Sequence, residues 1–172
     1  TFLLTVTSVN DPPTISDIAD QSTNEDTATP AIPFTVGDLE TPPGSLTVSG
    51  SSSNTTLAPN ANIVFGGSGA NRTVTITPAA NQNGTTTITV TVSDGSLSAS
   101  DTFLLTVTAV NDAPMANGDN YSVNEDNTLT VGAPGVLGND IDVEGNPLTA
   151  VLLPGGPSIN GTLTLNADGS FT

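Results

Sequence analysis

One phrase occurs twice in this chain, and it limits what the chain can fold into. Residues 1–13 read TFLLTVTSVNDPP, and residues 102–114 read TFLLTVTAVNDAP. Such a repeat at a distance of about one hundred residues is typical of tandem units that each fold in the same way. The chain is therefore expected to contain repeats of one small domain.

Two further landmarks keep nearly the same spacing. The sequence STNED at 22–26 is matched by SVNED at 122–126. The sequence DLETPPGSLT at 38–47 is matched by DIDVEGNPLT at 140–149, where an Asp-x-acid triplet precedes Leu-Thr at the same distance. Three markers in one order indicate a true tandem repeat.

The repeat has the pattern of β-strands. Residues 85–92 read TTTITVTV, so that Ile88, Val90 and Val92 share one face and threonines the other. Period-two alternation of β-branched residues indicates half-buried strands. Strands are predicted over 14–18, 31–36, 45–49, 62–65, 72–77, 85–92 and 98–108. The predicted core is Ile15, Phe34, Val36, Leu46, Val48, Phe65, Val74, Ile76, Ile88, Val90, Phe103, Leu105 and Val107.

Turn signals separate these strands and complete the prediction of fold class. Asp94-Gly95 and Asp168-Gly169 are hairpin turn pairs, and residues 161–171 are predicted to form a hairpin. Seven short strands in about one hundred residues suit an antiparallel Greek-key β-sandwich of immunoglobulin-like size. The chain is thus predicted to be all-β, with one complete and two partial repeats in tandem.

The repeat frame divides the chain into three predicted segments. Residues 1–10 are interpreted as the last strand of a preceding repeat with its linker, residues 11–111 as a complete sandwich, and residues 112–172 as the N-terminal part of the next one. We therefore expect the sequence to be a window on a longer chain.

The charge balance excludes several classes of partner and reaction. Seventeen acidic residues face one base, Arg72, for a net charge of -16, and the chain has no Lys, His or Cys. Binding nucleic acid or anionic lipid requires basic residues, and no apolar run is long enough to span a membrane. Without His or Cys, the commonest general base and an activated thiol are both missing. The sequence predicts no enzyme.

The residues that remain as metal ligands are all oxygen donors. Carboxylates, Asn side chains and backbone carbonyls are the ligands that calcium prefers. No short loop supplies enough of them in succession, so that calcium ligands would have to converge from separated segments. Alternatively, the acidity serves solubility alone.

The motifs together resemble a known family. The order is VSDGS at 92–96, then VNDAP at 110–114, followed by an NED element and a DxD triplet. This resembles the cadherin-like and related bacterial immunoglobulin-like tandem repeats of very large surface proteins, including the VCBS and tandem-95 types. The resemblance implies a series of sandwiches with Ca²⁺ at the inter-repeat joints.

The resemblance also implies which residues would bind that calcium. They are the linker Asn-Asp pairs, the acidic triplets, the Asp of the Ser-Asp-Gly turn and the Glu of each NED element. Matched to this sequence, they are Asn10, Asp11, Glu25, Asp38, Glu40, Asp94, Asn111, Asp112, Glu125, Asp140 and Asp142. Glu25 is expected at the end of its domain opposite to Asp38. Cadherins add an acidic pair where this chain has Asn81-Gln82-Asn83, which favours one ion or fewer per joint. Alternatively, the Asp and Asn residues only form turns.

The resemblance implies a role outside the cell. The predicted function is a non-enzymatic, calcium-stiffened spacer or stalk of a secreted or surface-attached adhesion protein, with neighbouring repeats as partners and an adhesion ligand that the sequence does not name. One alternative is a building block of an extracellular filament, sheath or matrix, in which residues 1–9 donate a strand to another molecule. Another alternative is a glycan-binding module, for which Tyr121 is the single weak aromatic candidate.

Overall fold

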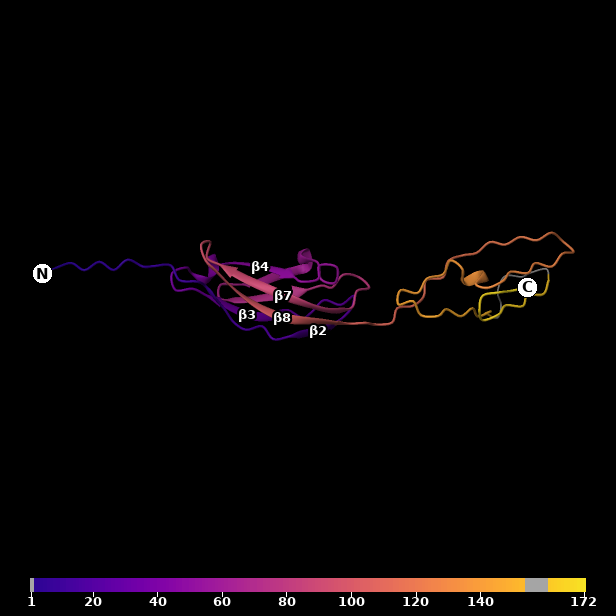
Figure 1. Ribbon diagram of the computed structural model, residues 1–172, viewed down its shortest axis with the longest axis horizontal. Helices are drawn as coiled ribbons and strands as arrows, with labels where there is room; N and C mark the ends of the chain where they lie inside the picture. Colours follow the sequence, from indigo (N-terminus) through magenta and orange to yellow (C-terminus); the bar gives the residue numbers. More distant parts are fainter. Residues whose placement is uncertain (1, 154–160) are drawn as a thin grey trace. The chain divides into compact units, whose positions relative to one another are not determined.

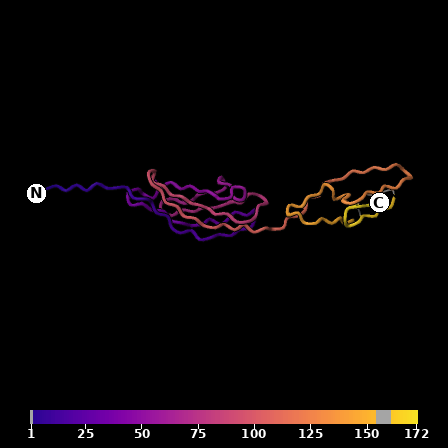
Figure 2. Tube along the Cα trace, viewed as in Figure 1, coloured from indigo at the N-terminus to yellow at the C-terminus, as the bar shows by residue number. Residues whose placement is uncertain are grey.

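The computed structural model describes residues 2–153 and 161–172. Residues 1 and 154–160, which belong to the predicted first and third segments, lie outside the described residues. The chain divides into two compact units, Thr1–Val110 and Asn111–Thr172. Each unit is described by itself; Figure 1 and Figure 2 show their chain paths. None of the helical turns in the described ranges is long and apolar enough to cross a membrane.

Unit 1 consists of two four-stranded sheets packed face to face, which confirms the predicted all-β sandwich. One sheet has the order β1-β3-β6-β5 and the other the order β2-β8-β7-β4. The first sheet contains β1 (Thr14–Ile15), β3 (Ile32–Gly37), β6 (Asn71–Ile76) and β5 (Ile63–Ser68). The second contains β2 (Gln21–Asn24), β8 (Ser98–Thr108), β7 (Gly84–Ser93) and β4 (Thr47–Ser52). Two short 3-10 turns are η1 (Pro43–Ser45) and η2 (Asn60–Asn62).

The predicted first strand over 14–18 is wrong in its extent, because the chain changes sheets there. β1 pairs antiparallel with β3, whereas β2 pairs parallel with β8. Two carboxylates accept the backbone N–H groups that the crossing leaves without a ladder partner. Asp101 Oδ2 accepts from Ile18 N at 2.9 Å, and Asp20 Oδ1 accepts from Leu104 N at 2.7 Å. The unit therefore has eight strands instead of seven.

The core lies between the two sheets and follows the alternation of the strands. Ile88, Val90 and Val92 of β7 and Leu105 of β8 have no exposed surface. The outward positions between them are threonines in β7, and those beside Leu105 in β8 are Leu104 and Thr106. All thirteen predicted core residues are buried or pack against the buried cluster. The buried residues that the alternation did not single out are Ile18, Ile32, Leu57, Ala58 and Ile63.

The acidic residues of unit 1 avoid the outer faces of both sheets. At the outward positions of its eight strands, all of them described, no side chain is ionisable. The acids lie instead at the two ends of the sandwich and along the crossing between β1 and β2. Negative charge is therefore kept off the outer faces of the two sheets.

Unit 2 has less regular structure. Within its described residues, the strand contacts are three isolated antiparallel bridges, Met115 with Ile141, Val131 with Phe171, and Leu165 with Phe171. The last bridge and the bond from Asn166 N to Ser170 O, 2.9 Å long, confirm the predicted hairpin with its turn at Asp168-Gly169. One 3-10 turn, η3 (Gly135–Leu137), lies in this unit. The rings of Tyr121 and Phe171 meet edge to face, with centroids 4.9 Å apart.

Candidate functional site

The candidate site is the end of unit 1 at which its first linker enters. Thr14 of β1 pairs with Gly37 of β3, so residues just before 14 lie beside residues just after 37. Ser93, the last residue of β7, pairs with Ser98 of β8, which places the Asp94 turn at the end of the second sheet. Strand register therefore brings the first linker, the acidic triplet after β3 and the β7–β8 turn to one end of the sandwich.

The linker residue Asn10 is held by the turn residue Asp94. Its Nδ2 donates to Asp94 Oδ2 at 2.8 Å. The other oxygen of Asp94 accepts from the backbone N–H groups of Ser96 and Leu97 at 2.6 and 2.7 Å. The donors at Leu97, Asn10 and Ser96, in this order of importance, hold the pKa of the Asp94 carboxyl below its ordinary value of 3.8. Asp94 is thus an anchored carboxylate as well as a turn former.

The next linker residue, Asp11, is held by the acidic triplet. Its backbone N–H donates to Glu40 Oε2 at 3.2 Å, and Ser8 Oγ lies 3.5 Å from Glu40 Oε1. Asp38 Oδ1 accepts from the backbone N–H groups of Glu40 and Thr41 at 2.9 and 2.7 Å, which closes the loop after β3. The two side chains of the triplet therefore have different roles, one in the loop and one at the linker.

Asp38 has an oxygen that this arrangement does not satisfy. Its Oδ2 is buried and has no hydrogen-bond partner. Buried polar atoms in folded proteins are almost always paired, and a carboxylate oxygen without a donor calls for a proton, a water molecule or a cation. Across the described part of the chain, no group of three or more acidic side chains is close enough to hold a metal ion.

The start of unit 2 has the same linker contacts as unit 1, made by residues of a somewhat different sequence. Asp112 N donates to Glu144 Oε2 at 3.3 Å, as Asp11 N does to Glu40. Asp142 Oδ1 accepts from Asn146 N at 2.8 Å and thus closes its loop as Asp38 does.

These bonds match Asp142 and Glu144 to Asp38 and Glu40, so that the triplet equivalent to DLE is DVE at 142–144. Glu144 was not among the predicted ligands. The prediction aligned the two acidic triplets by their distance to the Leu-Thr that follows, and in unit 2 the segment between triplet and Leu-Thr is two residues shorter. Asp140 instead accepts from Asn117 N at 2.7 Å. The predicted linker residue Asn111 accepts from Asn146 Nδ2 at 2.8 Å through its Oδ1. The D-x-E motif that the two triplets share could have identified Glu144 from the sequence.

The two NED elements have the same turn but different surroundings. Asp26 and Asp126 both adopt positive φ angles, 57° and 64°. Glu25 is 4% exposed, and its Oε1 accepts from Val110 N at 2.6 Å, at the end of unit 1 that lies opposite to Asp38. Glu125 is exposed. The burial of Glu25 comes from the end of β8, where Glu25 N also donates to Thr108 O at 2.9 Å.

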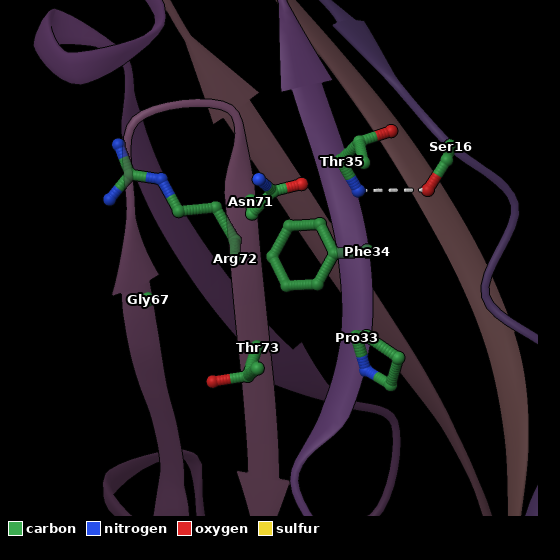
Figure 3. A pocket seen from close by; sticks show the side chains of 8 residues that line it. All are labelled: Ser16, Pro33, Phe34, Thr35, Gly67, Asn71, Arg72 and Thr73. Atoms are coloured by element: carbon green, nitrogen blue, oxygen red, sulfur yellow. Dashed lines mark hydrogen bonds between the residues drawn. The ribbon is translucent and has the colours of Figure 1, made fainter.

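A shallow groove on the outer face of the first sheet was not predicted. Figure 3 shows its lining, with Pro33 and Thr35 from β3 and Thr73 from β6; Phe34, whose side chain is buried in the core, also borders it. Arg72, the one base of the sequence, also borders it. Its guanidinium donates to the backbone carbonyls of Gly69 and Pro43 at 2.9 and 3.0 Å. This arginine therefore stabilises the loops whose carbonyls it contacts.

Comparison with protein families agrees with this architecture. Residues 10–108, more than half of the chain, match the bacterial Ig domain. The chain belongs to the bacterial Ig domain family. Residues 111–172 match the bacterial cadherin-like domain. The bacterial Ig domain thus coincides with the sandwich of unit 1, and the predicted resemblance to cadherin-like and bacterial Ig-like repeats is confirmed. No curated protein matches the chain.

Solved structures similar to this bacterial Ig domain protein include titin domains and a glycoside hydrolase. A chimeric titin Z1Z2 with an exogenous decorin peptide is 17% identical over 60% of this chain and 100% of its own, with a TM-score of 0.43. Titin domain M3 is 18% identical over 56% of this chain and 96% of its own, with a TM-score of 0.42. An endo-fucoidan hydrolase of glycoside hydrolase family 107 is 20% identical over 58% of this chain but only 14% of its own, with a TM-score of 0.43.

Proposed function

We propose that this chain is a non-enzymatic repeat segment of a secreted or surface-attached bacterial protein, and that calcium stiffens it as a spacer. The observation that carries the proposal is the buried, unpartnered Oδ2 of Asp38, at the acid-rich end of unit 1. A divalent cation would satisfy this oxygen and would reduce the repulsion among the carboxylates around it. Membership in a family of repeat-type domains supports a structural role rather than a chemical one.

The donor set at this end suits calcium. It consists of carboxylate oxygens, the Asn10 amide oxygen and backbone carbonyls, which are hard ligands, and the chain has no soft or imidazole ligand. In the proposal, Asp38, Glu40 and Asp94 hold the ion together with Asn10 and Asp11, which requires these side chains to move closer together than they lie in this structure. In unit 2 the corresponding residues are Asn111, Asp112 and Asp142, joined by Glu144. Glu25, Glu125 and Asp140 remain predicted ligands of the same joints.

The mechanical role follows from which segments such an ion would tie together. Asp11 and Asn10 belong to the linker, whereas Glu40 and Asp94 belong to loops of the sandwich. Hydrogen bonds of 2.8 and 3.2 Å between exposed groups hold this linker only weakly. An ion coordinated by both parts would fix the direction in which the linker leaves the domain, which a spacer under load requires.

Thermal unfolding with and without calcium tests this proposal. We expect millimolar calcium to raise the melting temperature by several degrees, because about 2.7 kcal/mol is gained when the free ion reaches about 100 times its dissociation constant. Asp38→Asn should abolish most of that gain. Asp17→Asn, which removes the same charge from an exposed position without a ligand role, should retain it. Equal melting curves in calcium and in chelator would contradict the proposal.

A second candidate function is a building block of an extracellular filament or matrix. It is favoured by the exposed apolar residues of the segment 2–9, where Phe2 and Leu3 are 90% and 92% exposed. A spacer should sediment as a monomer at all concentrations, whereas a filament subunit should form larger species as its concentration rises. A glycan-binding role has less support, since Tyr121 packs against Phe171.

A further inference from the structure

The middle of the sequence carries no acid. Between Glu40 and Asp94 there is no Asp or Glu, and the one ionisable residue of this stretch is Arg72. The seventeen acids of the chain divide into seven before residue 41 and ten after residue 93. The acid-free stretch, residues 41–93, contains β4, β5, β6 and β7, and β4 and β5 are outer strands of the two sheets. The side of unit 1 that these two strands form therefore has no acid of its own.

On this side, β5 presents backbone groups that no strand pairs with. Thr77 N donates to Asn62 O at 3.1 Å, in the same register in which β5 pairs with β6. Hydrogen-bonded pairs alternate with non-bonded pairs along antiparallel strands. Counted from Asn62, Phe65 and Gly67 therefore direct their N–H and C=O groups away from β6. Among the described residues, these groups have no hydrogen-bond partner.

The opposite edge of the same sheet is closed. There β1 has only two residues, and beyond it β3 contains Pro33, which has no N–H group to offer. Thr35 exchanges bonds with Ser16, whose N donates to Thr35 O at 2.9 Å and whose Oγ accepts from Thr35 N at 3.0 Å. By contrast, β5 has neither a proline nor a charged residue. An edge without such protection is a template for another strand.

The edge of β4, on the same side as β5, is covered at both ends. Asn60 Oδ1 accepts from Ser52 N at 2.9 Å, and the Arg72 guanidinium donates to Leu46 O at 3.4 Å. The open edge of unit 1 on its acid-free side is therefore that of β5.

We propose that β5 pairs antiparallel with β5 of a second copy of this chain, so that the two first sheets join into one. With a two-fold axis at Phe65, the two Phe65 residues exchange both backbone bonds, and each Gly67 N donates to Ile63 O of the other copy. On the outer face, Val64 then lies opposite Gly66 of the second copy. Val64 is 58% exposed, and Gly66 has no side chain to obstruct it.

The charge of the chain favours a second copy at this edge. Two chains of net charge -16 repel each other, and the acid-free side reduces this repulsion where they meet. A two-fold interface uses the same patch on both molecules, so one uncharged strand is sufficient for it. The pairing deepens the second candidate function, the building block of a filament or matrix, and rests on it. None of the proposed calcium ligands lies in β5.

Chemical cross-linking of the full chain tests the pairing. In Val64→Cys, the thiols of two paired copies are diagonal neighbours about 7–8 Å apart, which a short bismaleimide can span. Thr102→Cys is the matched control, because Thr102 is an exposed outward residue of β8 in the other sheet. The native chain has no cysteine to interfere. We expect at least about ten times more covalent dimer from Val64→Cys, because paired thiols react at an effective concentration near millimolar.

Sedimentation of the chain without cysteine gives a second measurement. The native chain should form a dimer between micromolar and about millimolar concentration, as is usual for contacts of small area. Val64→Asp should weaken this dimer at least about ten-fold, because it places two carboxylates near each other at the joined edge. Thr102→Asp adds the same charge away from the edge and should weaken the dimer less than about two-fold.

The cross-linking yield should be equal in calcium and in chelator, and Leu4→Asp in the segment 2–9 should leave it unchanged. Equal yields from Val64→Cys and Thr102→Cys, or equal weakening by the two Asp variants, would overturn the inference. Larger species without a Val64→Cys cross-link would refute the pairing of β5 and leave the second candidate function standing. A native chain that stays monomeric up to about millimolar concentration would overturn both.

Discussion

The two copies of one phrase, residues 1–13 and 102–114, differ in their strands and agree in their linkers. The strand of the first copy lies in solvent, with Leu4 74% exposed, whereas its counterpart Leu105 in β8 is fully buried. The linkers behave alike, since Asp11 N and Asp112 N each donate to the Glu of a D-x-E triplet, at 3.2 and 3.3 Å. The linker contact needs only a nearby loop, whereas the strand needs two neighbouring strands and an apolar slot.

This difference shows how far tertiary context governs a β-strand. Alternation in TFLLTVT creates an apolar face, but burial of that face depends on β7, β2 and the opposite sheet. An isolated strand has no hydrogen-bond ladder of its own, unlike a helix, and gains nothing from its propensity alone. These seven residues are therefore buried only where strands such as β7 and β2 and an opposite sheet surround them.

The largest expected effect comes from one substitution made in both copies. Leu105→Asp should destabilise unit 1 by more than about 4 kcal/mol, because it places an unpaired carboxylate in the core. Leu4→Asp should change stability by less than about 0.5 kcal/mol, as exposed substitutions usually do. Urea unfolding followed by circular dichroism measures both. If Leu105→Asp leaves no folded protein, Leu105→Met should still fold, at a cost below about 1.5 kcal/mol. Similar losses from the two Asp variants would break the comparison.

A smaller effect is expected at the end of β8, where only the first NED element is buried. Glu25→Ala removes the acceptor of the 2.6 Å bond from Val110 N and should cost about 2 kcal/mol, as is usual for a bond to a charged group. Glu125→Ala changes an exposed residue of the same motif and should cost less than about 0.5 kcal/mol. The two midpoints of urea unfolding give the comparison. A loss in Glu125→Ala as large as in Glu25→Ala would show that the motif acts through its turn alone.

A third effect is expected at the edge where β2 meets β8. Asp20→Ala removes the acceptor of Leu104 N and should cost about 1 kcal/mol, since water can replace the bond at this exposed position. Asp17→Ala, a few residues earlier and also exposed, is the matched control and should be neutral. Amide hydrogen exchange at Leu104 should also become faster in the first variant and remain unchanged in the second. Unchanged exchange in both would contradict the role of Asp20 in holding β8.

The smallest effect concerns the first linker and depends on pH. Folding lowers the pKa of Asp94 below its ordinary value of 3.8. Its carboxylate therefore contributes stability at pH values above 3.8 and loses that contribution as the pH falls through the lower pKa of the folded state. Asp94→Asn should therefore show a shallower loss of stability than the native chain as the pH falls below 3.8. Urea midpoints across this range measure the slope. Parallel slopes in the two proteins would exclude Asp94 from the acid response.

Much of the fold could be predicted because alternation reports burial directly. The core positions of β7 and β8 follow from TTTITVTV and TFLLTVT, and the turn at Asp168-Gly169 follows from its residue types. The exchange of sheets between β1 and β2 could not be predicted. It depends on Asp20 and Asp101, whose carboxylates accept backbone N–H groups more than eighty residues away in sequence. Bonds over such distances leave no local pattern.

The residues of the candidate site could largely be predicted from sequence motifs, but the contacts among them could not. The motifs pointed to Asn10, Asp11 and Asp94, yet the bond from Asn10 to Asp94 depends on β1 beginning and β7 ending at the same end of the sandwich. Alignment by spacing selected Asp140 and missed Glu144. The loop after the triplet is two residues shorter in unit 2, which moves the triplet along the sequence but preserves the bond from the linker Asp N–H to the triplet Glu.

By itself, the sequence determined the repeat, the strand alternation, the turn positions and a ligand set made only of oxygen. These features depend on neighbours in the chain, whose spacing the backbone sets. Only the tertiary structure decided which Glu of the two NED elements is buried and which oxygen of Asp38 has no partner. Burial and pairing depend on segments that are remote in sequence, and identical residues take different roles when those segments differ.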